Sequence, residues 1–138
     1  MNNDDRRSIL FVGGGQETIP GVEIAKAMGL CVIVSDMSAE APCARLADHF
    51  LLADTYSVSD TLREVESFCE KYRSIDGVMC MATDVPLTVA IVAQELGLPG
   101  IPIEAAKIVS DKMLMKDCFK ASYLPIPWYS EVSDAENL

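Results

Sequence analysis

The chain has 138 residues, of which 50% are hydrophobic and 23% are charged, so it can bury a core and is not a disordered chain. Its net charge of −10 argues against binding to nucleic acid or to an anionic membrane surface, because both need clustered cations. The 5 cysteines form no Cys-x-x-Cys pair and His49 is the only histidine, so we expect no metal site. Reduced thiols and a polar N-terminus predict a cytoplasmic protein.

Short apolar runs alternate with amphipathic segments along most of the chain. The run Ser8–Val12 is apolar after its first residue and is followed by glycine, which is typical of a strand buried on both faces. The segment 18–30 then has apolar residues at helical spacing, with Gly29 near its end. The same patterns predict further strands at Cys31–Ser35, Phe50–Leu52, Val78–Met81 and Ile101, and further helices at Ala41–Ala47, Ser59–Tyr72, Val85–Leu96, Ile103–Val109 and Asp111–Ser122.

Strands that alternate with helices imply crossover connections and a parallel sheet. We therefore expect a doubly wound α/β fold with five strands in the order 3-2-1-4-5. The alternation ends between Gly100 and Ser110, which predicts one domain over residues 1–109 and the start of a second over 110–138.

Three polar loops follow predicted strands, at the edge where a parallel sheet binds its ligands. The first is the loop 13–17, whose three glycines let a ligand approach the backbone at a helix N-terminus, with Gly14, Gly15 and Gln16 as the candidate binding residues. A tight turn without a ligand explains the same residues. The third loop contains Thr83 and Asp84, which either meet a polar substrate or cap the next helix.

The second loop begins with Asp36, which invites comparison with dinucleotide-binding proteins. In those folds an acidic residue at this place holds a ribose hydroxyl. The glycine fingerprint is broken, however, because Thr18 stands where the third glycine of Gly-x-Gly-x-x-Gly belongs. Asp36 is otherwise an ordinary turn residue.

Lys112 and Lys116 lie four residues apart on one face of the last predicted helix. Two cations so placed can reach a polyphosphate, although most such pairs belong to a solvated helix face.

Taken together, these segments resemble the domain that precedes the nucleotide-binding half of ATP-grasp ligases, and the first helix of that half. The likeness covers residues 8–128 and is closest to carbamoyl-phosphate-synthase-like and biotin-carboxylase-like enzymes. The matching stretches are the loop 13–16, the strand region 29–36, Arg45–Asp48, Ile75–Val78, Leu96–Gly100, Ser110–Lys112 and Leu124–Pro127.

The resemblance implies a Rossmann-like fold in an ATP- and magnesium-dependent ligase, which joins a carboxylate to an amine or thiol through an acyl phosphate. It implies that Lys112 contacts ATP phosphate. The loop residues would face a small carboxylate substrate, and these are Gly14, Gly15, Gln16, Asp36, Thr83 and Asp84. Related domains take part in dimer contacts, so the resemblance also implies a homodimer.

The family's remaining ATP determinants and its magnesium carboxylates lie further along, and we find none before Leu138. We therefore expect these 138 residues to be the inactive front of an enzyme. Two alternatives stay open at this point. One is a fragment of an NAD(P)-binding Rossmann oxidoreductase, and the other is a non-catalytic binding or dimerisation module.

Overall fold

Four of the expected strands form one parallel sheet in the computed structural model, which describes residues 5–132. The strands lie in the order β3-β2-β1-β4, which confirms the parallel α/β class and the first four places of the predicted order. They are β1 (Ser8–Val12), β2 (Cys31–Asp36), β3 (His49–Leu52) and β4 (Gly77–Met79). The helices are the short η1 (Gln16–Thr18), α1 (Ile19–Ala27), α2 (Val58–Lys71), α3 (Pro86–Glu95), α4 (Ile103–Ser110) and α5 (Lys112–Ala121).

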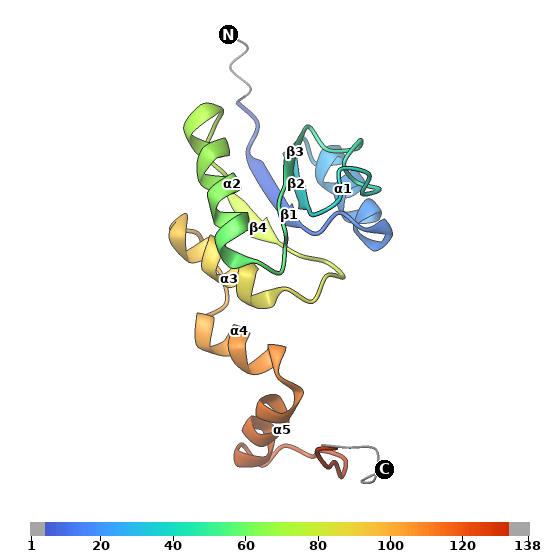
Figure 1. Cartoon of the computed structure of the whole chain (residues 1–138), viewed down its shortest axis with the longest axis vertical. Helices are drawn as coiled ribbons and strands as arrows, with labels where there is room; N and C mark the ends of the chain where they lie inside the picture. The colour runs from blue at the N-terminus through green and yellow to red at the C-terminus, as the bar shows by residue number, and fades with distance from the viewer. Residues whose placement is uncertain (1–4, 133–138) are drawn as a thin grey trace.

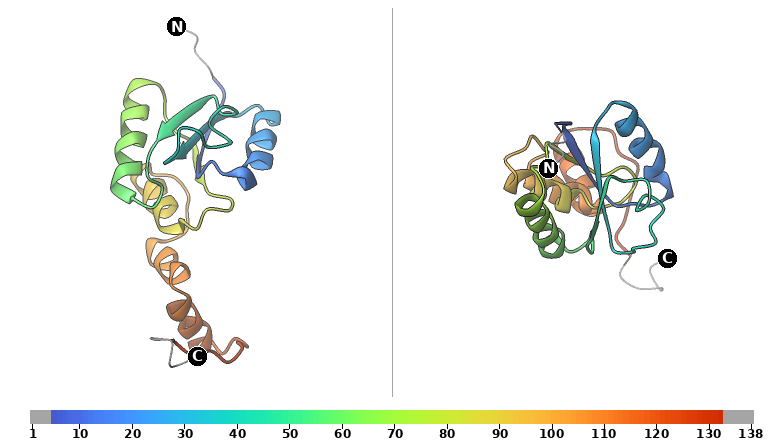
Figure 2. Two further views of the ribbon diagram at one scale, coloured as in Figure 1. Left: turned by 45° about the vertical axis from the view of Figure 1, so that its right-hand side comes forward. Right: turned by 90° about the horizontal axis from the view of Figure 1, so that it is seen from above.

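Side chains of the central strand β1 point alternately to two cores, as the period of a strand requires. Leu10 and Val12 join one core, with residues of α2 and α3, while Phe11 joins the other, with residues of α1. Helices therefore cover both faces of the sheet, with α1 on one side and α2 and α3 on the other (Figures 1 and 2). This arrangement explains why β1 is apolar along almost its whole length.

The predicted fifth strand at Ile101 is wrong for the described residues. Ile101 lies in an extended link between α3 and α4 and is 49% exposed. Pro99 and Pro102 flank it, and neither has the N–H group that a strand needs to join a sheet. The link therefore leads directly into α4.

The short helix predicted at Ala41–Ala47 is also wrong, because this stretch forms consecutive turns. Cys43 donates its N–H to the carbonyl of Gly14, 3.0 Å away, while its own carbonyl accepts the N–H groups of Leu46 and Ala47 at 3.1 Å. Lys26 of α1 reaches the carbonyl of Leu46 at 2.6 Å. The local bonds thus close turns that do not extend into a helix, and contacts from distant parts of the chain hold the stretch in place.

Beyond the sheet, α4 and α5 extend as an arm, which we define as residues 103–132. Both views show the arm leaving the side of the sheet where the strands have their carboxyl ends (Figures 1 and 2). α4 packs against α3, and α5 packs against α4. None of the helices in residues 5–132 has the length and hydropathy that crossing a membrane requires.

At the amino ends of the strands, Asp76 links β4 to β1. Its carboxylate Oδ2 accepts the backbone N–H of Ser8 at 2.7 Å and the Ser8 hydroxyl at 3.1 Å. The hydrogen bond from the Ser8 backbone is the main reason why the pKa of Asp76 lies below its usual range. A carboxyl group with a lowered pKa stabilises the fold above its ordinary pKa, and the effect disappears as pH falls through the folded value.

We predict that Asp76→Asn lowers the free energy of unfolding by about 1 kcal/mol at neutral pH, because the charged acceptor of Ser8 is lost. The difference from the unchanged protein should begin to shrink below about pH 3.9, the ordinary pKa of an aspartate, and should close once pH has fallen through the lower pKa of the folded state. Urea unfolding across this pH range measures it. Glu66→Gln, on the exposed side of α2, is the control. A gap that stays constant with pH would contradict the role given to the Asp76 charge.

Candidate functional site at the carboxyl ends of the strands

The loops after β1, β2 and β4 meet at one edge of the sheet, here called the carboxyl edge. The loop after β1 is bound to the end of β2 by two hydrogen bonds. Gly13 donates its N–H to the carbonyl of Ser35 at 2.8 Å, and Gly14 donates to Oδ2 of Asp36 at 2.8 Å. The other carboxylate oxygen of Asp36 accepts the N–H of Ser38 at 2.9 Å. Asp36 thus fixes the shape of two loops at once.

The turn at Gly13 depends on the absence of a side chain. Its φ of +99° lies in the region that residues other than glycine rarely adopt. A Cβ at this position would also lie 1.9 Å from Oγ1 of Thr83. Thr83 therefore rests directly on the Gly13 backbone and brings the loop after β4 onto the loop after β1. Sequence analysis placed Gly13 in the first loop but not among the residues expected to face the substrate, although its place directly after a strand was a visible signal.

Cys43 is a second residue that sequence analysis missed. It packs beside Gly14, donates its N–H to the Gly14 carbonyl and places its Sγ 3.4 Å from the carbonyl oxygen of Gly15. Burial, and then the nearby charge of Asp36, raise the pKa of the Cys43 thiol. Cys43 is fully buried, and its contacts with Gly14 and Gly15 support the loop. No local sequence pattern reveals a contact between residues this far apart.

The residues predicted in the third loop are placed at the same edge. Thr83 is partly buried over Gly13, while Asp84 is exposed. The alternative that Asp84 caps α3 is wrong, because Val85 occupies the N-cap and no side chain bonds the first turn. Asp84 is therefore free to face solvent or a ligand. The loop also places Met81 on Gly21 of α1, where a Cβ would lie 2.0 Å from its sulfur.

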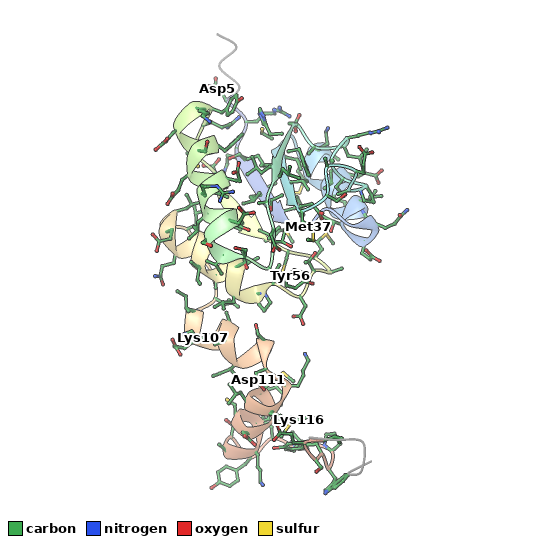
Figure 3. The ribbon with its side chains drawn as sticks, in the orientation of Figure 1. Asp5, Met37, Tyr56, Lys107, Asp111 and Lys116 are labelled. Atoms are coloured by element: carbon green, nitrogen blue, oxygen red, sulfur yellow. The ribbon has the colours of Figure 1, made fainter. Side chains whose placement is uncertain are left out.

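Lys112 lies on the arm, away from the loops of the carboxyl edge. Asp111 caps α5 by accepting the N–H groups of Met113 at 2.8 Å and Leu114 at 3.1 Å. This cap leaves Lys112 in the first turn with an exposed side chain. Figure 3 shows Asp111 and Lys116 along the arm, with Met37 and Tyr56 at the body of the domain. The predicted residues thus form two groups, one at the carboxyl edge and one on α5.

The chemistry of the carboxyl edge favours binding over catalysis. Gln16 and Asp84 are exposed polar side chains, Asp36 is partly buried, and the start of η1 presents backbone N–H groups. In residues 5–132, no three His, Cys, Asp or Glu side chains come together in a way that could hold a metal ion. The described residues therefore do not fit a magnesium site.

The sequence profile of the ATP-grasp N-terminal domain family matches residues 22–100, and the chain therefore belongs to this family. A search of curated protein sequences gave no significant match. The fold and family agree with the resemblance described from the sequence.

Solved structures give the same result. Phosphoribosylglycinamide synthetase from Anaerococcus prevotii aligns with a TM-score of 0.74 and 26% identity, covering 86% of this chain and 30% of that one. N5-carboxyaminoimidazole ribonucleotide synthetase from Thermotoga maritima aligns with a TM-score of 0.71 and 26% identity, covering 94% and 34%. N5-carboxyaminoimidazole synthetase from Staphylococcus aureus, complexed with ADP, shares the fold at 19% identity and a TM-score of 0.66, covering 88% and 31%. The present chain spans about a third of each of these proteins.

We predict that Gly13→Ala destabilises the protein more than Gly29→Ala. Both glycines have positive φ, and left-handed backbone costs about 1–2 kcal/mol for alanine at either one. Only Gly13 has Thr83 against it, whereas nothing lies within 4 Å of a Cβ at Gly29. Urea unfolding should give an additional loss at Gly13 of at least about 1 kcal/mol, as overpacking usually does.

The double variant Gly13→Ala with Thr83→Gly tests the cause of this loss. Removing the Thr83 side chain should bring the cost of the alanine down to that seen at Gly29. An unchanged cost in the double variant would show that the loop after β4 does not rest on Gly13.

Proposed function

We propose that the chain is the substrate-side part of an ATP-dependent ligase, which joins a carboxylate to an amine or thiol through an acyl phosphate. The observation that carries the proposal is the family match over residues 22–100, in a domain whose carboxyl-edge loops and lysine-bearing arm lie on the same side of the sheet. The proteins with similar structures are named as synthetases, and one of them is an ADP complex.

The two groups of residues would divide the work in this proposal. Gly14, Gly15 and Gln16 would line the site of the carboxylate substrate, and the backbone N–H groups of Gly15 and Gln16 at the start of η1 would receive it. The N–H group of Gly14 already bonds Asp36, so this residue would contribute shape. Asp36 would hold this loop in shape, and Thr83 with Asp84 would bound the site on its other side. These roles are supported by the common position of the residues at the carboxyl edge of the sheet.

Lys112 would contact ATP phosphate from the first turn of α5. Its exposed position after the Asp111 cap leaves the ammonium group available for an anion. Charge neutralisation of transferring phosphate by a lysine is a main part of catalysis in phosphoryl transfer. No step is assigned to magnesium, because the described residues do not form a site for it.

In this proposal the arm also connects the sheet domain to a further domain of a longer protein. We propose a domain boundary between residues 109 and 110, near the junction of α4 and α5. α5 has 10 residues and none of them is buried, and a helix this short is marginal in water without a surface to cover it. Leu114 and Leu124 are 50% and 51% exposed. A second domain packed on the arm would cover them. The homodimer stays a prediction.

Of the alternatives, the dinucleotide-binding oxidoreductase is not favoured by the comparisons. Asp36, which such a protein would use for a ribose, accepts two backbone N–H groups within the protein. The non-catalytic module has no observation of its own in its favour.

We predict that these 138 residues alone release no ADP from ATP in the presence of mixed carboxylates and amines, because one lysine cannot hold a triphosphate for reaction. A coupled assay for ADP measures this. Substrate-dependent ADP release by this chain alone would contradict the assignment as a substrate-side part.

The reading frame after codon 138 supplies the second test. We expect it to continue for about 200 residues or more, the size of further domains. In that longer protein, Lys112→Gln should raise the KM for ATP about tenfold, while Lys107→Gln on α4 should leave it unchanged. A stop codon after residue 138 would overturn the proposed function.

A further inference from the structure

One edge of the sheet has no covering strand among residues 5–132. β3 is the outermost strand and pairs with β2 alone. The outer side of such a strand presents backbone N–H and C=O groups that another strand can bond. The arm begins at the other edge of the sheet, because α4 packs on α3 and α3 packs on β4 (Figure 1). A domain packed on the arm therefore need not reach β3.

A small hollow lies between β3 and α2, and we call it the edge groove. Leu51 and Phe68 are buried in it, whereas Tyr72 at its rim is 68% exposed. Its volume is about 140 Å³, well below the roughly 300–1,000 Å³ of pockets that hold small molecules. A side chain from another protein surface suits this volume better than a free ligand does. The lining residues are Leu51, Glu64, Ser67, Phe68, Lys71 and Tyr72.

Three rings hold the exposed rim of the edge groove in place. The ring centre of His49 lies 5.1 Å from that of Phe68 and 5.6 Å from that of Tyr72. The rings of Phe68 and Tyr72 are stacked, with their centres 5.3 Å apart. An aromatic side chain that is already ordered loses little conformational freedom when a partner covers it. The rim is thus prepared for contact with another protein surface.

Glu64 and Lys71 carry opposite charges at the two ends of the edge groove. They are seven residues apart on α2, which is about 10 Å along the helix, with Ser67 between them. Glu64 contacts Arg63 at 3.2 Å, and Nζ of Lys71 donates to Oγ of Ser67 at 2.8 Å. Both contacts are exposed and therefore weak. A half-turn about an axis near Ser67 exchanges the two ends, so it brings Glu64 of one copy against Lys71 of another.

We propose that two copies of this chain associate through the edge groove with two-fold symmetry. Their β3 strands would pair antiparallel and join two four-stranded sheets into one. Their α2 helices would lie antiparallel on one face of this sheet, with two Glu64–Lys71 ion pairs between the copies and each Tyr72 covered. A second copy is favoured over a foreign partner because the charges of this surface complement themselves, as a two-fold interface requires. The proposal does not depend on the ligase function.

Sedimentation equilibrium of the 138-residue chain tests the association, and a dimer should be populated at about 100 μM. Glu64→Lys places like charges opposite each other in both pairs, and Lys71→Glu does the same with the other sign. Each substitution should weaken the dimer at least about tenfold. A mixture of the two variants restores opposite charges at both places. The mixture should therefore form a heterodimer with about the affinity of the unchanged chain, which would also show that both variants fold.

Two control variants separate the edge groove from net charge. Glu66→Lys changes the charge by the same amount as Glu64→Lys, on the exposed side of α2 outside the groove, and Lys107→Glu on α4 matches Lys71→Glu. Neither control should alter the dimer. A chain that stays monomeric at about 500 μM would overturn the proposal. A dimer that both groove variants leave intact, or that the mixture does not restore, forms through another surface and would overturn it as well.

Discussion

Strand β1 is paired on both of its sides, and this pairing constrains the rest of the domain. Leu10 lies opposite Ile33 of β2 and opposite Val78 of β4. A strand in the centre of a parallel sheet has its backbone groups bonded within the sheet and both faces under helices. The chain can turn away only after the strand, which it does at Gly13. The position of the candidate site follows from this turn, because the loops of the neighbouring strands end beside it.

Gly13 and Asp36 stabilise this turn in different ways. Gly13 supplies a backbone conformation and a space that Thr83 fills. Asp36 supplies the acceptor for the next N–H group, at Gly14, and so ties two parallel strands together where their ladder ends. The N–H groups of Gly13 and Gly14 are used within the protein, and they hold the neighbouring Gly15 and Gln16, whose N–H groups a ligand would use. Binding and structure therefore depend on adjacent residues of one loop, and a substitution here affects both.

The arm is held together by different contacts from those of the sheet domain. Its helices pack in sequence, α3 with α4 and α4 with α5, and α5 buries none of its residues. Its order depends on local devices: the Asp111 cap at one end and the contact of Tyr129 with the helix at the other. A segment built in this way keeps apolar and charged side chains available. The role proposed for Lys112, contact with phosphate, uses this exposure.

The sequence by itself determined the elements whose signals are local. An unbroken apolar run predicted β1, and the Asp111 position before a helical pattern predicted the start of α5. The parallel class and the order of four strands followed from alternation and general topology. The approach of Cys43 to Gly14, the turns in place of a helix at residues 41–47 and the exposed link at Ile101 were decided only by tertiary structure. In each case a partner distant in the chain, or the lack of one, sets the backbone hydrogen bonds, and a local pattern has no information about that partner.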